Sequence, residues 1–249
     1  MTMIDPRTAE LQALHSLSIE DLTRELYELE TDGLATLVTR LGDDGLAELL
    51  AELEATDAAR LVGRLSRAQA ADVLEEMAPD DAADVMAELE DDDAAGVLNE
   101  MEPDEASDIR SLLQYPPETA GGLMTPNFIA IPPDLTSDAA LSLLRHTARE
   151  AETIYYFYVT EPPTNRTPTG RLLGVLSLRG LLRALPEARV RDLMDDRLVK
   201  VRADADQEEA ARMLDQYHLL AIPVVDDEDR LLGIITQDDA HEVLEEEAN

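Results

Sequence analysis

Residues 70–105 consist of three consecutive blocks of twelve, AADVLEEMAPDD, AADVMAELEDDD and AAGVLNEMEPDE. The register continues in both directions without a gap, so that seven such blocks cover residues 34–117. Positions one, four, five and eight of the block are apolar with few exceptions, and these positions lie on one face of an α-helix. The blocks therefore predict one short helix each, with their acidic ends supplying N-cap oxygens and first-turn acids.

A helix of about eight residues is not stable on its own. Its apolar face must be buried against neighbouring helices, and the alanines at positions one and two of the block allow those helices to approach closely. We therefore expect residues 1–120 to form an acidic, right-handed superhelix of short α-helices. Such a stack generally serves as a scaffold or a binding surface.

The charge of the chain is strongly negative. Its 249 residues include 20 basic and 55 acidic side chains, a formal net charge of −35. This balance excludes nucleic acid as a partner, since binding phosphates requires clustered cations. It also argues against docking on an anionic membrane surface. The chain has no cysteine, so disulfides, thiolate zinc sites and cysteine nucleophiles are excluded as well.

The acids are concentrated in the helical repeat, where residues 68–109 hold sixteen acids and no base. Two interpretations remain open: a solvated face that keeps the protein in solution, or an anionic surface that a cation stabilises. Asp80 and Asp84 are one helical turn apart, and carboxylates at that spacing repel each other unless something neutralises them. A hydrated Mg²⁺ ion held by one or two carboxylates would do so.

A break at Tyr115-Pro116-Pro117 and Gly121-Gly122 ends the helical repeat, and two similar halves follow, at 121–188 and 189–249. Each half has the pattern β-α-β-β-α, and we expect the two halves to pack their sheets together. The expected strands are 128–131, 154–159, 172–177, 198–201, 222–226 and 231–236, and the expected helices are 137–147, 178–185, 206–217 and 238–247.

Nothing in the sequence indicates an enzyme. The four histidines fall in unrelated predicted helices without metal-ligand spacing. Ser177 and Thr236 lie at strand ends without a His-Asp partner pair, and there is no P-loop or GxGxxG motif.

The two halves resemble tandem CBS (cystathionine-β-synthase-type) domains. The residues that carry this resemblance are a Leu-Met pair before a short strand, Val224-Val225-Asp226, and GIITQDD at 233–239. The order of the whole chain is more specific. An acidic helical repeat, then YPPETAGGLMTP at 115–126, ETIYY at 152–156 and GVLSLR at 174–179, resembles the cytosolic region of the MgtE family of magnesium transporters.

That resemblance implies a homodimeric Mg²⁺ sensor, paired through the CBS domains, in which Mg²⁺ between acidic surfaces draws the N domain onto the CBS domains and keeps a pore closed. It implies Asp239 as a shared Mg²⁺ ligand, with Asp80 and Asp84 as its partners. Glu208 and Glu242 match acidic family positions near the dimer and connecting-helix interface. His218 replaces a family carboxylate, and Asp215, one turn earlier, would compensate.

The family also binds ATP between its CBS domains, which implies that Tyr156 stacks on the base and Arg179 meets phosphate. Gly180 stands where the family has a ribose-binding aspartate, and Leu219 stands where it often has an aromatic residue. An alternative function is therefore an adenine-nucleotide-sensing CBS module with a helical protein-interaction adapter. A third is a purely structural adapter.

Neither a signal-peptide pattern at residues 1–10 nor an apolar stretch of 18 residues occurs, so a cytosolic location is expected. The resemblance adds that residues 236–248 lead into a connecting helix and a transmembrane pore domain of the same polypeptide. Residues 1–249, which do not include that domain, would then lie on the cytoplasmic side of the cell membrane.

Overall fold

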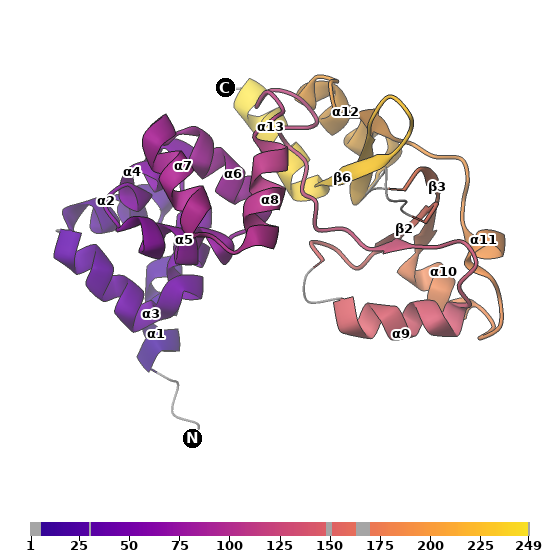
Figure 1. Cartoon of the computed structure of the whole chain (residues 1–249), viewed down its shortest axis with the longest axis horizontal. Helices are drawn as coiled ribbons and strands as arrows, with labels where there is room; N and C mark the ends of the chain where they lie inside the picture. Colours follow the sequence, from indigo (N-terminus) through magenta and orange to yellow (C-terminus); the bar gives the residue numbers. More distant parts are fainter. Residues whose placement is uncertain (1–5, 30, 148–150, 163–169, 249) are drawn as a thin grey trace. The chain divides into compact units, whose positions relative to one another are not determined.

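The helical repeat and the duplicated β-α-β-β-α segment form two separate units of the chain (Figure 1). The computed structural model describes residues 6–29, 31–147, 151–162 and 170–248. The first unit ends at Leu113 and the second begins at Gln114. The predicted fold class, a helical domain followed by a tandem CBS-type pair, is confirmed.

Short helices make up the described part of the first unit. They are α1 (Pro6–His15), α2 (Ile19–Glu28), α3 (Thr31–Ala51), α4 (Ala55–Val62), α5 (Arg67–Glu75), α6 (Pro79–Ala87), α7 (Asp91–Glu100) and α8 (Pro103–Leu112). From α4 onward, each block of twelve forms one helix. The longer α3 is two such helices joined at Gly42, whose φ of 78° lies in the left-handed region that glycine adopts without a steric cost.

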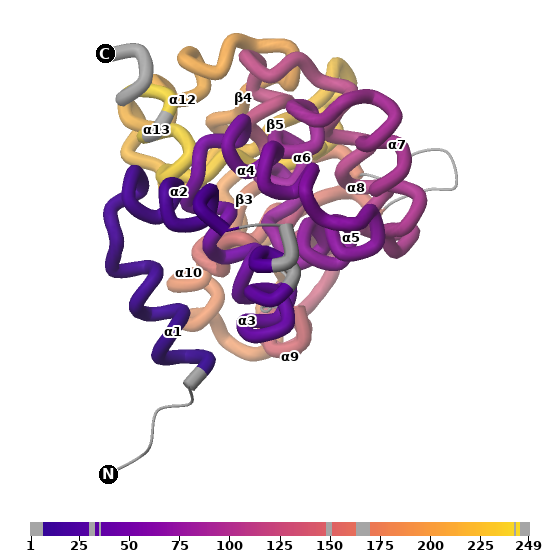
Figure 2. Tube along the Cα trace, turned by 90° about the vertical axis from the view of Figure 1, so that its left-hand side faces the viewer, coloured from indigo at the N-terminus to yellow at the C-terminus, as the bar shows by residue number. Residues whose placement is uncertain are grey.

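Each helix of the first unit packs against the helix two places further along the chain, from the pair α1 and α3 to the pair α6 and α8. Figure 2 shows the short helices following one another along the trace. Position four of the block is buried in all seven blocks, at Leu37, Leu49, Leu61, Val73, Val85, Val97 and Ile109. Burial of this shared face stabilises helices that are individually too short to persist.

The acidic block ends lie in the first turns of α6, α7 and α8, as the sequence predicts, but the predicted N-cap hydrogen bonds are absent from these three helices. The N-cap residues of α6, α7 and α8 are Ala78, Glu90 and Glu102, and none makes a side-chain capping hydrogen bond. Proline at the start of α6 and α8 moves the acids into the first turn, where they interact favourably with the helix dipole.

The second unit contains two copies of one motif. The first copy is β1 (Ala130–Ile131), α9 (Ser137–Thr147), β2 (Tyr156–Thr160), β3 (Leu172–Ser177) and α10 (Leu178–Arg183). After α11 (Val190–Leu193), the second copy is β4 (Val201–Arg202), α12 (Gln207–Tyr217), β5 (Ala221–Val225), β6 (Leu231–Thr236) and α13 (Gln237–Ala248). In each sheet the middle strand pairs in parallel with the first and antiparallel with the third.

The two sheets pack against each other within the second unit, as expected from the sequence. One core cluster joins side chains from both sheets: Tyr158, Leu172, Ala221, Val225, Leu231 and Ile234. The other face of the first sheet packs against α9 and α10, which lie together beside it (Figure 1). Alternate residues of β2 therefore serve two different cores, with Phe157 and Val159 on the helix side and Tyr158 between the sheets.

The Leu-Met and Gly motifs recur in both halves because the methionine of each half packs against the glycine of the other half. Met124, from the first half, lies over Gly233 in β6 of the second half, and Met194, from the second half, lies over Gly174 in β3 of the first. A short backbone pairing accompanies each contact, Thr125 with Ile234 and Val175 with Asp195. Only glycine leaves room for this approach, because a Cβ at Gly233 would lie 2.8 Å from the Thr125 carbonyl oxygen.

We therefore expect Gly233→Ala to lower the free energy of unfolding of the second unit by about 1–3 kcal/mol, because the added methyl group meets backbone that cannot move aside. The measurement is denaturant unfolding followed by tyrosine fluorescence, since five of the six tyrosines belong to this unit. Gly33→Ala is the control, because its Cβ would make only an ordinary 3.4 Å contact with Leu29 inside a helix. Equal stability of Gly233→Ala and the parent protein would show that Met124 and Thr125 do not pack tightly against Gly233.

Candidate functional site

Asp239 occupies the junction between β6 and α13. Its Oδ2 accepts hydrogen bonds from the Thr236 backbone N–H at 3.2 Å and from Thr236 Oγ1 at 2.7 Å. The side chain thus reaches back over the helix start as the third residue of a capping box does. Only Oδ2 is used in these two bonds, so the second oxygen can take a further partner while the first holds α13 in place.

Two more carboxylates lie near Asp239. Partial desolvation raises the pKa of Glu152, and the nearby carboxylates of Asp239 and Asp238 raise it further. Glu152 precedes β2, and its backbone N–H donates to the Asn127 carbonyl at 2.8 Å. The sequence contains no signal for this proximity, because Glu152 and Asp239 lie far apart in the chain and in different halves. Ionised together, these groups repel, and a bound cation would relieve that repulsion.

The other predicted ligands of the second unit lie on α12 and α13. Glu208 forms an ion pair with Arg212, one turn further along α12. Asp215 is exposed and borders a cavity of about 290 Å³ between the two helices, which His218 also lines. Glu242 belongs to α13, but its side chain lies outside the described residues.

In the first unit, Asp80 and Asp84 both lie on α6, one turn apart, with Asp80 half-buried and Asp84 exposed. Among the described residues of the chain, no three His, Asp or Glu side chains are arranged to hold one metal ion. The structure thus brings Asp80 near Asp84, and Asp239 near Asp238 and Glu152. Glu208 is instead paired with Arg212.

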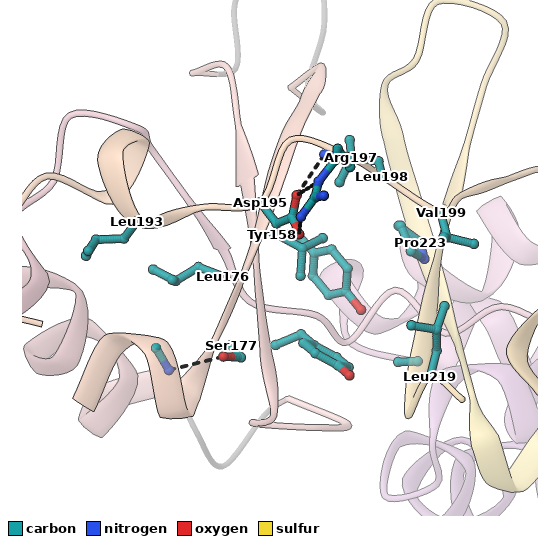
Figure 3. A pocket seen from close by; sticks show the side chains of 14 residues that line it. Tyr158, Leu176, Ser177, Leu193, Asp195, Arg197, Leu198, Val199, Leu219 and Pro223 are labelled. Carbon is teal, nitrogen blue, oxygen red and sulfur yellow. Dashed lines mark hydrogen bonds and ion pairs between the residues drawn. The ribbon is translucent and has the colours of Figure 1, made fainter. Parts of the chain in front are cut away.

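A cavity of about 330 Å³ lies between the two sheets of the second unit (Figure 3). Strand β2 and the end of β3 form one side, the segment from α11 to β4 a second, and β5 a third. Its lining residues are Tyr156, Tyr158, Val175, Leu176, Ser177, Gly180, Leu193, Asp195, Arg197, Leu198, Val199, Leu219, Ala221 and Pro223.

The few polar groups of the cavity are mostly engaged with one another. Arg197 donates to Asp195 through its backbone N–H at 3.0 Å and through two guanidinium nitrogens at 3.1 and 3.2 Å, as the dashed lines in Figure 3 indicate. This arginine holds the pKa of Asp195 below its usual value. Ser177 Oγ accepts from the Gly180 N–H at 3.1 Å.

The two residues predicted for nucleotide binding are placed differently. Tyr156 lines the cavity, whereas Arg179 is exposed on α10 and is not among the lining residues. Sequence reasoning missed Tyr158, Asp195 and Arg197. The alternation along β2 could have placed Tyr158 opposite to Phe157, but it could not show that this face borders a cavity.

The second unit is a CBS pair by sequence as well as by fold. The model of the CBS domain family matches residues 120–187 and 190–246, and the model of the MgtE intracellular N domain matches residues 17–118. The chain therefore belongs to the MgtE family of magnesium transporters. None of the described helices is both long and apolar enough to cross a membrane.

Individual relatives agree with this assignment. The magnesium transporter MgtE of Thermus thermophilus is 46% identical over 142 residues, and that of Bacillus subtilis is 40% identical over 141 residues. In each case the matched stretch is 57% of this chain and 30% of the relative, so the chain spans less than a third of their length.

Two crystal structures match almost the whole fold. One, described as the soluble part of a magnesium transporter, has a TM-score of 0.83 at 31% identity and covers 98% of this chain and 93% of that one. The other, the cytosolic domain of the Mg²⁺ channel MgtE in complex with ATP, has a TM-score of 0.82 at 36% identity and covers 96% and 95%.

The acidic group around Asp239 generates a pH-dependent prediction. Glu152→Gln should raise the free energy of unfolding of the second unit at pH 7 by about 0.2–0.5 kcal/mol, because folding raises the pKa of this carboxyl and so disfavours its ionised form. The gain should shrink as the pH falls through the folded-state pKa and vanish at about pH 3, below the ordinary value of 4.5, since the parent carboxyl is then protonated in both states.

Denaturant unfolding at both pH values measures the effect. Glu187→Gln, at an exposed position after α10, is the control and should change stability little at either pH. An equal gain from Glu152→Gln at both pH values would show that folding does not disfavour the ionised form of Glu152.

Proposed function

We propose that this chain is the Mg²⁺-sensing regulatory region of a magnesium transporter or channel. Mg²⁺ bridges the acidic surface of the N domain and the surface of the CBS pair and stabilises the closed state, and its release at low Mg²⁺ permits opening. In this proposal the N domain comprises 1–120 and the CBS domains 121–188 and 189–249. The role is regulatory and not catalytic.

The observation that carries the proposal is the carboxylate arrangement at the start of α13. Asp239 is held by Thr236 through one oxygen, and Asp238 and Glu152 add negative charge beside it. Mg²⁺ favours oxygen ligands and keeps several of its waters, so one or two carboxylates from each surface suffice for a bridging ion. Asp80 and Asp84, on one face of α6, are the proposed partners from the N domain.

The remaining proposed ligands differ in how readily they can take part. Glu208 must first release Arg212, which makes Mg²⁺ binding there weaker. Asp215 is exposed and needs no such exchange, and Glu242 is proposed on family resemblance alone. Several weak sites suit a sensor, because each ion shifts the equilibrium only by the difference between its affinities for the two states.

The oligomeric state and the connection to a pore are proposed from the resemblance to the MgtE family. A homodimer forms through the CBS domains, and a transmembrane pore domain of the same polypeptide receives the signal. This region would then work on the cytoplasmic side of the cell membrane.

Small-angle scattering of the whole chain from zero to about 20 mM MgCl₂ tests the proposal, with NaCl controls of equal ionic strength to account for screening. We expect the radius of gyration to fall with MgCl₂ and not with NaCl. Asp239→Asn should weaken this response, because the amide still accepts from Thr236 but loses its charge. Asp138→Asn, in the first turn of α9, is the matched control. An unchanged radius in both salts would refute closure by Mg²⁺.

A second candidate function is adenine-nucleotide binding by the CBS pair, and the cavity between its two sheets favours it. The related cytosolic domain was crystallised in complex with ATP. In this chain Tyr156 would contact the base from β2, and Arg179 would reach the phosphates from α10.

The role of Arg179 is tested by calorimetric titration with ATP and with adenosine. Arg179→Ala should weaken ATP binding roughly tenfold, since a charge-assisted hydrogen bond is lost, and leave adenosine binding unchanged. Arg183→Ala, on the same helix, serves as the control for a general loss of positive charge. If Arg179→Ala binds ATP as tightly as the parent protein does, Arg179 does not contact phosphate.

A further inference from the structure

Two adjacent glycines, Gly121 and Gly122, lie in the segment between α8 and β1, where such a pair usually indicates a flexible point. In the structure both are held in place. The Gly121 N–H donates to the Ala203 carbonyl at 2.9 Å, and the Gly122 N–H donates to the Thr119 carbonyl at 2.9 Å. Gly121 is buried, and a Cβ there would lie 2.5 Å from the ring of Tyr115. The two glycines therefore allow close packing, and they are not a hinge.

Residues 115–122, here called the strap, are paired with the second half of the second unit, although the chain leads from them into the first half. The Ala120 N–H donates to the Ala205 carbonyl at 2.8 Å, and the Gln207 N–H donates to the Glu118 carbonyl at 3.0 Å. Ala120 is fully buried by this pairing. Only after the strap does the chain reach the first sheet, at β1.

The segment that joins the two halves makes the same pairing on the first half. The Ser137 N–H donates to the Ala188 carbonyl at 2.9 Å, and the Val190 N–H donates to the Leu135 carbonyl at 2.9 Å. These two bonds are the counterparts of the two strap bonds, with donor and acceptor in the same order. Each half is thus crossed by the segment that precedes the other half, which makes the strap a part of the duplicated fold and not a free linker.

Tyr115 fixes the beginning of the strap. Its half-buried ring packs against the strap itself, and both burial and the nearby carboxylate of Asp226 raise its pKa. Thr119 Oγ1 donates to the Pro116 carbonyl at 2.7 Å, and the rings of Pro116 and Pro117 fix two further backbone angles. The strap is therefore held to the second unit from Tyr115 onwards.

The freedom of the first unit must then come from the chain ahead of Tyr115. The Leu113 N–H still donates to the Ile109 carbonyl at 2.9 Å, so Leu113 belongs to the end of α8. The boundary between the two units lies directly after Leu113. A very short piece of backbone therefore separates two segments that are each fixed to their own unit.

We propose that the first unit turns about the backbone between Leu113 and Tyr115, and that the strap ties this movement to the start of α12 in the second half. The link to α12 is direct, because Gln207 is the first residue of that helix and its N–H is held by the strap. Since α12 packs against α13, the same movement reaches the last helix of the described chain. The movement itself rests on the proposed Mg²⁺-dependent closure, whereas the rigidity of the strap does not.

Amide hydrogen exchange of the whole chain, read by NMR at single residues, tests the rigidity. We expect the amides of Ala120 and Gly121 to exchange roughly a hundredfold or more slowly than in an unfolded chain, because both are buried and bonded to the second half. Exchange at the rate of an unfolded chain would show that the glycine pair is a hinge and would overturn the proposal.

Tyr115→Ala tests whether the strap supports α12. Loss of the ring should speed exchange at Ala120, Gly121 and Gln207 roughly tenfold, and leave Val190 in the equivalent segment unchanged. Tyr155→Ala is the matched control, since Tyr155 precedes β2 and is 57% exposed. Unchanged exchange at Gln207 in Tyr115→Ala, or equal acceleration at Val190, would refute the link to α12.

Distances between spin labels locate the pivot, and the chain has no native cysteine to remove. One label pair joins the strap to the end of α12 (Glu118→Cys with Gln216→Cys), and a second joins α7 to the same point (Asn99→Cys with Gln216→Cys); all three positions are exposed. Labelled protein is diluted into unlabelled protein, so that only distances within one chain are read. We expect the first pair to give a single narrow distribution with and without 20 mM MgCl₂, and the second pair to shift with MgCl₂.

The two pairs separate this inference from the proposed function. A broad or MgCl₂-dependent distribution for the Glu118 pair would place the pivot behind the strap and overturn the inference, whether or not the Asn99 pair responds. If neither pair responds to MgCl₂, closure by Mg²⁺ fails together with the movement about the pivot. In that case a narrow distribution for the Glu118 pair would still confirm that the strap is rigid.

Discussion

The close approach of Met124 to Gly233 and of Met194 to Gly174 is the constraint on which the second unit depends. Each half places its methionine on the third strand of the other half's sheet, and a short backbone pairing joins the two halves beside each methionine. Because the two contacts are reciprocal, they hold the sheets face to face at a set distance. The core around Tyr158 and Ile234 fills part of the space between them, and the cavity is the part that remains.

The same junctions determine where the charges lie. Strand β6, held by the pairing of Ile234 with Thr125, ends at Thr236, and Thr236 positions Asp239 at the start of α13. A rigid carboxylate beside Asp238 and Glu152 is costly in the absence of a cation and favourable in its presence. In the first unit, burial of the apolar face shared by the short helices offsets the repulsion among surface acids. This burial allows the unit to carry sixteen acids between Arg67 and Arg110.

The acidic group and the cavity lie close together along the chain. The cavity is largely apolar, and the one carboxylate among its lining residues, Asp195, is paired with Arg197. Strand β2 contributes Tyr156 and Tyr158 to the cavity, and the segment just before β2 contributes Glu152 to the acidic group. Residues of the same strand, or adjacent to it, therefore belong to both features.

The sequence by itself determined the twelve-residue helical repeat, the duplicated β-α-β-β-α order, the expected packing of the two sheets and the family. These properties depend on local periodicity and on motifs that are contiguous in the chain. The sequence prediction was wrong about the N-caps of α6 and α8, where proline takes the first helical position. It also named candidate metal ligands without showing which of them form ion pairs, such as Glu208 with Arg212. Only the tertiary structure decided that Glu152 lies near Asp239, that each methionine meets the other half's glycine and that Tyr158 faces a cavity. The reason is physical: each of these contacts joins segments that are distant in the chain or exposes a strand face to a space that exists only once both halves have packed.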